Sequence, residues 1–378
     1  MKHLLFLILF FSPCAHSTPL HQMNKAFTSI FDLGPYLSDE NSYLNKKNTK
    51  TIQKSLDDLE ASFKSVGHDK LIKHDLFAPS YELISENIKE STLSFKNDHK
   101  SYSYWILKET LTLCLDCHSR LPQSLTSSFQ NGELTFNPSN IKDPYDLGVT
   151  YLIVRRFSDA KEFFIRSIQE KIIKKEIHKI LLPFQQILMI ELKIRKDPVK
   201  MVSIIDDYLQ KKHLPSQIEN ELKLWNERLQ IWKTDPSITK GIKTEKDLID
   251  FIKRRLQVLK EENSFNDALK VDMLLASGII SEYFFENQNS PSAPDISYWL
   301  GWLEKRLKKE NFLSTGSLYF KQCIKKYPKS PRSKDCLDEY IESVEFDFSG
   351  SRGTAVPSEI RKEIKDLENL IMDKKNKN

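Results

Sequence analysis

One short stretch of the sequence combines residue types and a spacing that could do chemistry: Cys114-Leu115-Asp116-Cys117-His118. Two thiols three positions apart lie on one helical turn and reach the two vinyl groups of a porphyrin, and the adjacent histidine faces the iron. The motif predicts one covalent c-type haem, with thioethers at Cys114 and Cys117 and His118 as the proximal ligand. A redox-active thiol pair and half of a zinc site are the alternatives. A redox-active thiol pair would need a βαβ context, which the sequence lacks. A zinc site would need another Cys/His pair nearby, which is also missing.

The sixth position of the iron is predicted to hold Met23 or no protein ligand. Met23 is the only methionine between residue 18 and the motif, and it lies on an apolar stripe where a core methionine would also fit. Rival ligands are the histidines that precede the motif: His21, His68, His74 and His99. Arg120 is a candidate for a bidentate contact with a haem propionate, the alternative being a solvated surface arginine.

Four segments with helical periodicity precede and include the motif, because apolar residues recur in them at steps of three and four. The stripes are Leu20, Met23, Phe27 and Ile30; Ile52, Leu56, Leu59, Phe63 and Val66; Tyr81, Ile84, Ile88 and Phe95; and Tyr104, Leu107, Leu111, Cys114 and His118. Gly67 is expected to end the second helix, Pro79 to open the third and Pro122 to end the fourth. The pattern predicts a four-helix bundle.

A four-helix bundle with Cys-x-x-Cys-His at the end of its last helix resembles the cytochrome c-prime family. The resemblance covers about residues 18–125. It implies that the haem lies among the helices with the histidine of the motif as proximal ligand. It also implies a sixth position that is empty or filled by a methionine from the first helix, which in this sequence is Met23.

The second half of the chain resembles a tetratricopeptide-repeat array. Leu147, Gly148, Tyr151, Ala160 and Phe164 match the repeat spacing, in which small residues allow two helices to cross closely and aromatic rings fill the gap beside them. A second copy carries Leu300, Leu303, Leu307, Gly316, Phe320 and Pro328, with glycine replacing alanine and Glu304 at a small-residue position. The segments between are helical but degenerate. Such arrays present grooves, which predicts docking of a redox partner protein or peptide.

The first 17 residues, MKHLLFLILFFSPCAHS, predict a cleaved signal peptide: a lysine, an unbroken apolar run and a small-x-small cleavage site. The protein is therefore expected in a bacterial periplasm. Lipid anchoring at Cys14 is not expected, because the preceding Phe-Ser-Pro matches a lipobox poorly. In an oxidising compartment, Cys323 and Cys336 are predicted to form a disulfide across the turn between two helices, the alternative being two buried thiols.

Composition agrees with an all-α chain of more than one domain. The 378 residues include only 10 glycines, and the net charge of +5 is too small to imply nucleic acid. No later apolar stretch is long enough to span a membrane. The predicted divisions are a signal peptide (1–17), a haem domain (18–130), a linker (131–142), a repeat domain (143–347), and a C-terminal helix with a charged tail (348–378) that follows a flexible joint at 348–354.

These features predict an exported c-type cytochrome that transfers electrons and docks its partner through the repeats. Two alternatives stay open: a haem protein that binds diatomic gases, which needs an open sixth position, and an interaction scaffold in which the motif is structural. Peroxidase-type catalysis is not expected, because the sequence carries no recognisable acid/base motif beside the single haem motif. No phosphate-binding loop, zinc-protease or serine-hydrolase motif occurs either.

Overall fold

The computed structural model describes residues 19–67, 72–121, 141–211, 214–262, 267–307, 315–351 and 353–375. The predicted signal peptide at 1–17 lies outside the described residues, as do most of the predicted linker at 131–142 and the last three residues of the charged tail. The first half contains α1 (Pro19–Leu37), α2 (Glu40–Leu44), η1 (Lys46–Asn48), α3 (Thr49–Val66), α4 (Ala78–Lys96) and α5 (Lys100–Arg120).

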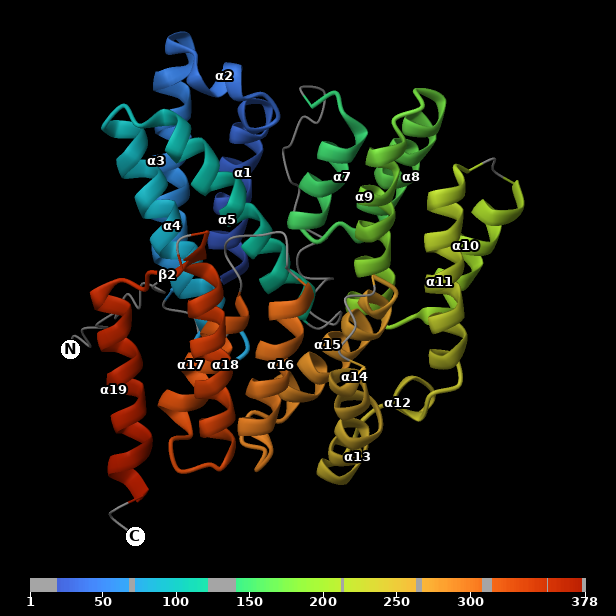
Figure 1. Cartoon of the computed structure of the whole chain (residues 1–378). Coiled ribbons are helices and arrows are strands. Elements are labelled where there is room, and N and C mark those ends of the chain that lie inside the picture. Colours follow the sequence, from blue (N-terminus) through green and yellow to red (C-terminus); the bar gives the residue numbers. More distant parts are fainter. Residues whose placement is uncertain are drawn as a thin grey trace, which may run out of the picture.

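The second half is also built from helices, which confirms the all-α prediction (Figure 1). Its helices are α7 (Pro144–Ile153), α8 (Phe157–Ile173), α9 (Ile177–Leu188), η4 (Met189–Ile194), α10 (Pro198–Lys211), α11 (Ser216–Trp232), α12 (Pro236–Thr239), α13 (Glu245–Phe251), η5 (Ile252–Gln257), α14 (Val258–Glu261), α15 (Leu269–Glu286), α16 (Ala293–Leu307), α17 (Thr315–Lys326), α18 (Arg332–Asp347) and α19 (Ser358–Lys375).

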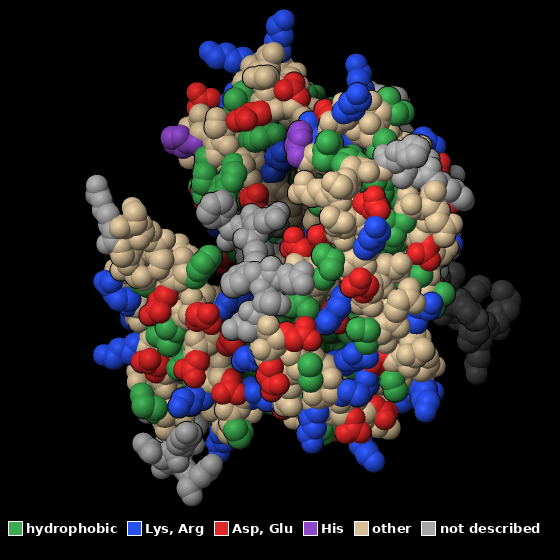
Figure 2. Space-filling model, turned by 45° about the vertical axis from the view of Figure 1, so that its right-hand side comes forward, with side chains coloured by type: hydrophobic (Ala, Val, Ile, Leu, Met, Phe, Trp, Pro, Cys, Tyr) green, Lys and Arg blue, Asp and Glu red, His purple; other side chains and the backbone are tan. Residues whose placement is uncertain are grey.

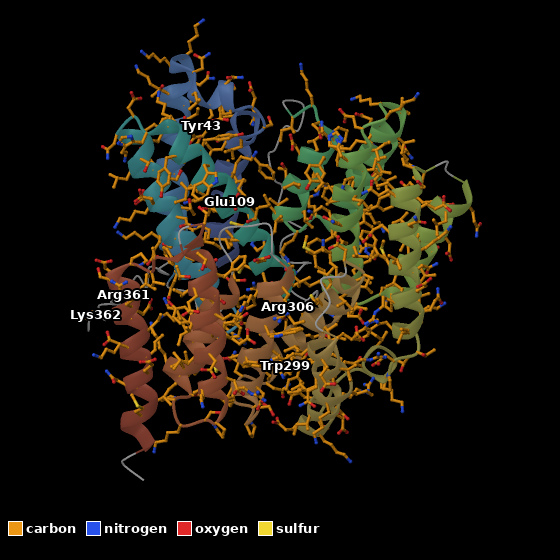
Figure 3. All side chains as sticks on the ribbon, in the orientation of Figure 1. Tyr43, Glu109, Trp299, Arg306, Arg361 and Lys362 are labelled. Carbon is orange, nitrogen blue, oxygen red and sulfur yellow. A yellow bond between two sulfur atoms is a disulfide. The ribbon has the colours of Figure 1, made fainter. Side chains whose placement is uncertain are left out.

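Helices α1, α3, α4 and α5 pack against one another in chain order. Each buries one apolar face, as in α3, where Ile52, Leu56, Leu59 and Phe63 recur at helical spacing. Helix α3 ends at Val66, before Gly67. The short α2 closes the outer end of the group, where Tyr43 lies (Figure 3). The buried hydroxyl of Tyr43 is 2.8 Å from the hydroxyl of Ser103 on α5.

Two helix pairs in the second half share one packing arrangement. A Cβ atom added to Gly148 of α7 would lie 2.5 Å from the ring of Phe164 on α8, and one added to Gly301 of α16 would lie 2.6 Å from the ring of Phe320 on α17. The glycines therefore allow each pair of helices to approach closely. In the later pair, Gly301 is the residue that the aromatic ring covers, whereas sequence reasoning had placed Glu304 at a small-residue position.

Helix α15 lies largely in the interior of the second half. Apolar residues occur all round it, so it has no polar face to turn to solvent, and almost all of its residues are buried. It packs against α16 on one side and against η4, a π-helical turn, on the other. At this second contact the backbone of Gly278 comes so close to η4 that an added Cβ would lie 2.2 Å from the carbonyl oxygen of Lys193.

The two halves meet at the C-terminal end of α5. Figure 1 shows this helix running from the first group of helices into the centre of the molecule, and it contacts α7, η4 and α15 there. Helix α4 also contacts α17. At its beginning α5 buries one face, but all residues from Asp116 to Leu121 are buried. The second half therefore encloses the last turn of α5.

The chain ends in a hairpin and a helix. Strands β1 (Ser349–Gly350) and β2 (Gly353–Thr354) pair antiparallel where a flexible joint was expected, and α19 then packs against α17 and α18. On the face drawn in Figure 2, positive and negative side chains are interspersed. Within the described residues, no helix is both long and apolar enough to cross a membrane.

Candidate functional site

Cys114, Cys117 and His118 lie on the buried face of α5, close to its C-terminal end. Buried residues recur along this face at Ser103, Leu107 and Thr110, which fixes the side of the helix that the motif presents to the interior. The three side chains line one side of a small cavity. Its other sides come from Met23, Ala26, Phe27 and Ile30 of α1, Phe63 of α3, Tyr81 and Ile84 of α4, and Ile72 before α4.

The ring of His118 is held in one orientation. Its Nδ1 donates a hydrogen bond to the backbone carbonyl of Ile153, the last residue of α7, and its ring meets that of Phe27 edge-on at 5.6 Å between centroids. Burial, and then the positive charge of Arg155, lower the pKa of His118 to about 3. The ring is therefore neutral at physiological pH. Because Nδ1 carries the proton, Nε2 keeps the lone pair that a metal ion requires.

The backbone of the same residue is held by Arg155, which is completely buried in the turn between α7 and α8. Its Nη1 donates to the carbonyl of His118, and its Nη2 donates to the carbonyl of Leu121 at 3.3 Å. These bonds satisfy carbonyl groups at the end of α5 that have no partner within the helix. Burial lowers the pKa of Arg155 to about 10, so its guanidinium remains charged at physiological pH.

The two sulfur atoms of the motif are buried thiols that are not bonded to each other. Burial raises the pKa of the Cys117 thiol to about 11, an effect larger than the opposing influence of Arg120 and Arg155. Reactive thiol pairs have depressed pKa values and partial exposure. The surroundings of Cys117 therefore disfavour the thioredoxin-like alternative.

The structure brings Met23 into the same cavity as His118, whereas two rival histidines lie elsewhere. His74 is buried against the ring of Phe285, and its Nδ1 accepts a hydrogen bond from the amide of Leu76. His99 precedes α5 at the end opposite to His118, about 28 Å away along the helix axis. His68 lies outside the described residues, and the side chain of His21 also falls outside them.

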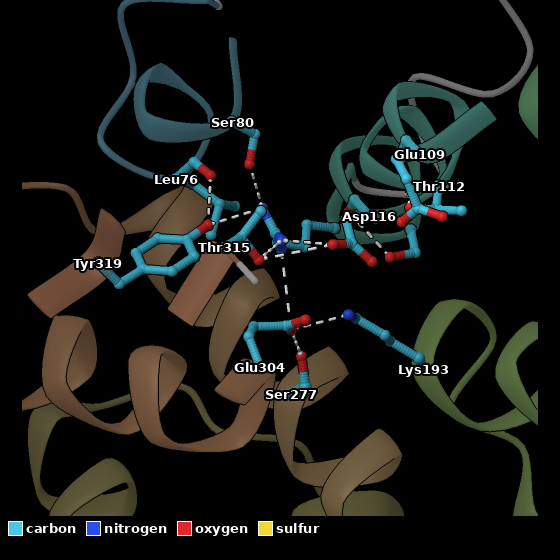
Figure 4. Close-up of polar contacts among 12 residues, drawn as sticks. Leu76, Ser80, Glu109, Thr112, Asp116, Lys193, Ser277, Glu304, Thr315 and Tyr319 are labelled. Carbon is cyan, nitrogen blue, oxygen red and sulfur yellow. Dashed lines mark hydrogen bonds and ion pairs between the residues drawn. The ribbon is translucent and has the colours of Figure 1, made fainter. Parts of the chain in front are cut away.

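Arg120 does not line the cavity. It is buried on another side of α5, where Nη1 donates to the hydroxyls of Ser80 at 2.9 Å and Tyr319 at 2.8 Å, and Nη2 donates to the hydroxyl of Thr315 at 3.1 Å (Figure 4). These bonds occupy a guanidinium for which sequence reasoning offered two alternatives, a contact with a propionate and a position at the surface, and its burial rules out the second. Arg120 joins the motif-bearing helix to α4 and α17.

Two carboxylates surround this arginine. Asp116 and Glu304 each lie 3.8 Å from a guanidinium nitrogen of Arg120, and Glu304 also accepts from Lys193 at 2.8 Å and from Ser277 at 2.7 Å. Burial by itself would raise the pKa of Glu304, but Lys193 and Arg120 hold it well below its usual range. Figure 4 shows how these side chains converge from separate helices. The network ties α5, η4, α15 and α16 together.

Cys323 of α17 and Cys336 of α18 are joined by a disulfide. Their Cα atoms are 6.4 Å apart, and neither side chain is exposed. The bond links two neighbouring helices, α17 and α18. It lies apart from the cavity, and the cysteines of the motif, Cys114 and Cys117, take no part in it.

The donor set of the cavity fits a c-type haem by its chemistry. Two thiols and a neutral, oriented histidine stand on one helix face, and a thioether faces them from another helix. Among the described residues, no group of three or more His, Cys, Asp or Glu could hold a metal ion. A haem does not need such a group, because the porphyrin itself supplies four ligands. The cavity volume is about 20 Å³, so a porphyrin enters only when the side chains across from α5 move outward.

Sequence reasoning missed Ile153, Arg155 and Gly301. Ile153 acts through its backbone carbonyl, which no side-chain pattern reveals. Arg155 had one visible signal, since it follows the end of a predicted helix, where glycine or asparagine usually terminates a helix. Comparison of the chain with known protein families, with curated proteins and with solved structures finds no match.

Proposed function

We propose that this protein is an exported c-type cytochrome that holds one covalent haem and transfers electrons. The observation that carries the proposal is the cavity in which Cys114, Cys117, His118 and Met23 meet. A c-type haem supplies one-electron chemistry at its iron and stays with the protein because it is bonded covalently. The protein supplies the thioether sulfurs, the Nε2 of a neutral histidine and an apolar enclosure.

In this proposal, helices α1, α3, α4 and α5 form a bundle similar to that of the cytochrome c-prime family, and the helices from α7 to α18 form a tetratricopeptide-like array. The repeated glycine–phenylalanine contacts at Gly148 and Gly301 support the second assignment. The array docks a redox partner. Because its inner side encloses the end of α5, docking uses other faces, on which Ile173, Ile177 and Leu182 of α8 and α9 are exposed.

Covalent attachment is the direct test. The wild type and the variant Cys114→Ser/Cys117→Ser are produced in a host competent in cytochrome c maturation, with Cys323→Ser/Cys336→Ser as the matched control that loses a different pair of cysteines. We expect one haem mass on the wild type and on the control after denaturation, a positive pyridine haemochrome assay for both, and neither signal for the first variant. An unmodified wild-type polypeptide would overturn the proposal and favour the scaffold alternative.

A further inference from the structure

Two residues of the second half, Ile153 and Arg155, contact the proposed proximal ligand. Ile153 accepts a hydrogen bond from the Nδ1 of His118, and Arg155 donates to the carbonyls of His118 and Leu121. Side chain and backbone of the histidine are therefore both held by the turn between α7 and α8. Neither contact comes from the helices that form the rest of the cavity.

Arg155 occupies a backbone conformation that usually belongs to glycine. Its φ is +61°, in the left-handed region, where a side chain costs free energy. In the described part of the chain, Asp98, Lys175 and Lys196 share this conformation. Asp98 and Lys175 are exposed and Lys196 is half-buried, whereas Arg155 is fully buried. At this turn the strained conformation directs a charged side chain into the interior, toward the end of α5.

We infer that Arg155 is a positioning residue for the haem iron: it fixes the backbone of His118 and places a permanent positive charge beside the iron site. The inference rests on the proposed haem. A positive charge nearby favours the iron state that carries one positive charge fewer, which is the reduced state. Its low-dielectric surroundings strengthen this effect, because Arg155 is buried.

A glycine at position 155 distinguishes the effect of the Arg155 side chain from the effect of the left-handed backbone conformation. Arg155→Gly removes the guanidinium but suits the left-handed turn, and Lys175→Gly makes the same backbone change at the exposed turn between α8 and α9. Both variants are purified with their haem, whose presence is verified by mass. The reduction potential and the absorption spectra of the oxidised and reduced forms are then measured.

We expect Lys175→Gly to match the wild type. In Arg155→Gly we expect the ratio of reduced to oxidised protein at a fixed ambient potential to fall about tenfold or more, which corresponds to about 59 mV for a one-electron couple. The absorption bands that report iron ligation should change as well. Potentials and spectra equal to those of Lys175→Gly would overturn the inference while leaving the haem assignment intact.

A second variant tests the inference if Arg155→Gly does not fold. Arg155→Gln removes the charge but keeps an amide that can donate to one carbonyl, so it retains part of the cap on α5. We expect its potential to fall in the same direction. An unchanged potential in Arg155→Gln would also overturn the inference. A wild type that carries no haem by mass would overturn the proposed function and the inference together.

Discussion

Nη1 of Arg120 lies 2.8 Å from the hydroxyl oxygen of Tyr319, which is 199 positions further along the chain. Tyr319 in turn donates to the carbonyl of Leu76 at 2.6 Å, so one phenol links α17 both to α5 and to the segment before α4. Arg120 stands two residues beyond the proposed haem ligand. The second half of the chain is therefore joined by side-chain contacts to the last turn of the motif-bearing helix.

Removing the guanidinium should destabilise the folded protein strongly. Arg120→Met leaves the buried carboxylates of Asp116 and Glu304 with less compensating charge, and we expect the free energy of unfolding to fall by about 3 kcal/mol or more. Urea unfolding followed by circular dichroism measures the change. The control Arg166→Met removes an exposed arginine that is paired with Glu162, and should cost less than about 1 kcal/mol. If both variants lost the same free energy of unfolding, the buried network around Arg120 would stabilise the protein no more than an exposed ion pair does.

The sixth position of the proposed haem iron is predicted to hold the sulfur of Met23 or no protein ligand. If Met23 is the ligand, Met23→Leu keeps the apolar volume and loses the ligand, so the low-spin spectrum and its weak band at the red end should give way to a high-spin spectrum. Met201→Leu, at a buried position of α10, is the matched control and should leave the spectrum unchanged. A high-spin wild type that Met23→Leu does not alter would assign Met23 to the core and favour the gas-binding alternative.

The parts of this fold that depend on residues close together in the sequence were predictable. Helical periodicity predicted α1, α3, α4 and α5, and the spacing of Cys114, Cys117 and His118 predicted residues of one helix face, because both signals repeat within a few positions. The placement of Met23 across from His118 followed from the stripe on the first helix, since one face of that helix had to turn inward.

The contacts between the halves were not predictable in the same way. Arg120 was expected at a propionate or at the surface, because nothing in its local sequence indicates that Thr315 and Tyr319 lie beside it. Ile153 contributes a carbonyl group, which every residue possesses. Gly301 was overlooked because Glu304 was matched to a small-residue position of the predicted second repeat. The contact with Phe320 shows that Gly301 allows a close approach, and Gly316, which was predicted, lies against the backbone of α16 as well.

The crossing of α15 and η4 should tolerate no side chain at Gly278. In Gly278→Ala the new Cβ would meet the backbone carbonyl of Lys193 at 2.2 Å, and a backbone atom cannot swing aside as a side chain can. We expect a loss of about 1–3 kcal/mol or more in the free energy of unfolding, measured in urea. Gly350→Ala is the control, because an added Cβ there meets nothing within 4 Å. A Gly278→Ala protein as stable as this control would contradict the close crossing.

Protonation of Asp235 should account for part of the stability that the folded protein loses at acidic pH. Burial alone would raise the pKa of this carboxyl, but Arg254, Ser237 and Arg255 outweigh it and lower the pKa to about 2. Well above pH 4 the carboxylate is ionised in both the folded and the unfolded chain, so its full stabilisation is present. Between pH 4 and pH 2 the unfolded chain takes up the proton first, and about 2 kcal/mol is lost.

The contribution is measured by comparing the free energy of unfolding of the wild type and Asp235→Asn at several pH values. The variant should be less stable at pH 7, and the gap should narrow as the pH falls from 4 to 2. Asp366→Asn, which removes an exposed carboxylate of α19, serves as the control. A gap between wild type and Asp235→Asn that stays constant over this range would show that the carboxylate does not titrate in the expected window.

The bond between Cys323 and Cys336 should stabilise the packing of α17 against α18. It closes a loop with a sequence separation of 13 between α17 and α18, and such a loop stabilises the folded state by about 3 kcal/mol in the chain-entropy model. We expect Cys323→Ala/Cys336→Ala to lose about this amount. Thiol titration of denatured, unreduced mature protein measures the bond directly: with thioethers at Cys114 and Cys117, no cysteine should react. Two reactive thiols per chain in a protein that carries haem would refute the disulfide and leave the haem assignment unaffected.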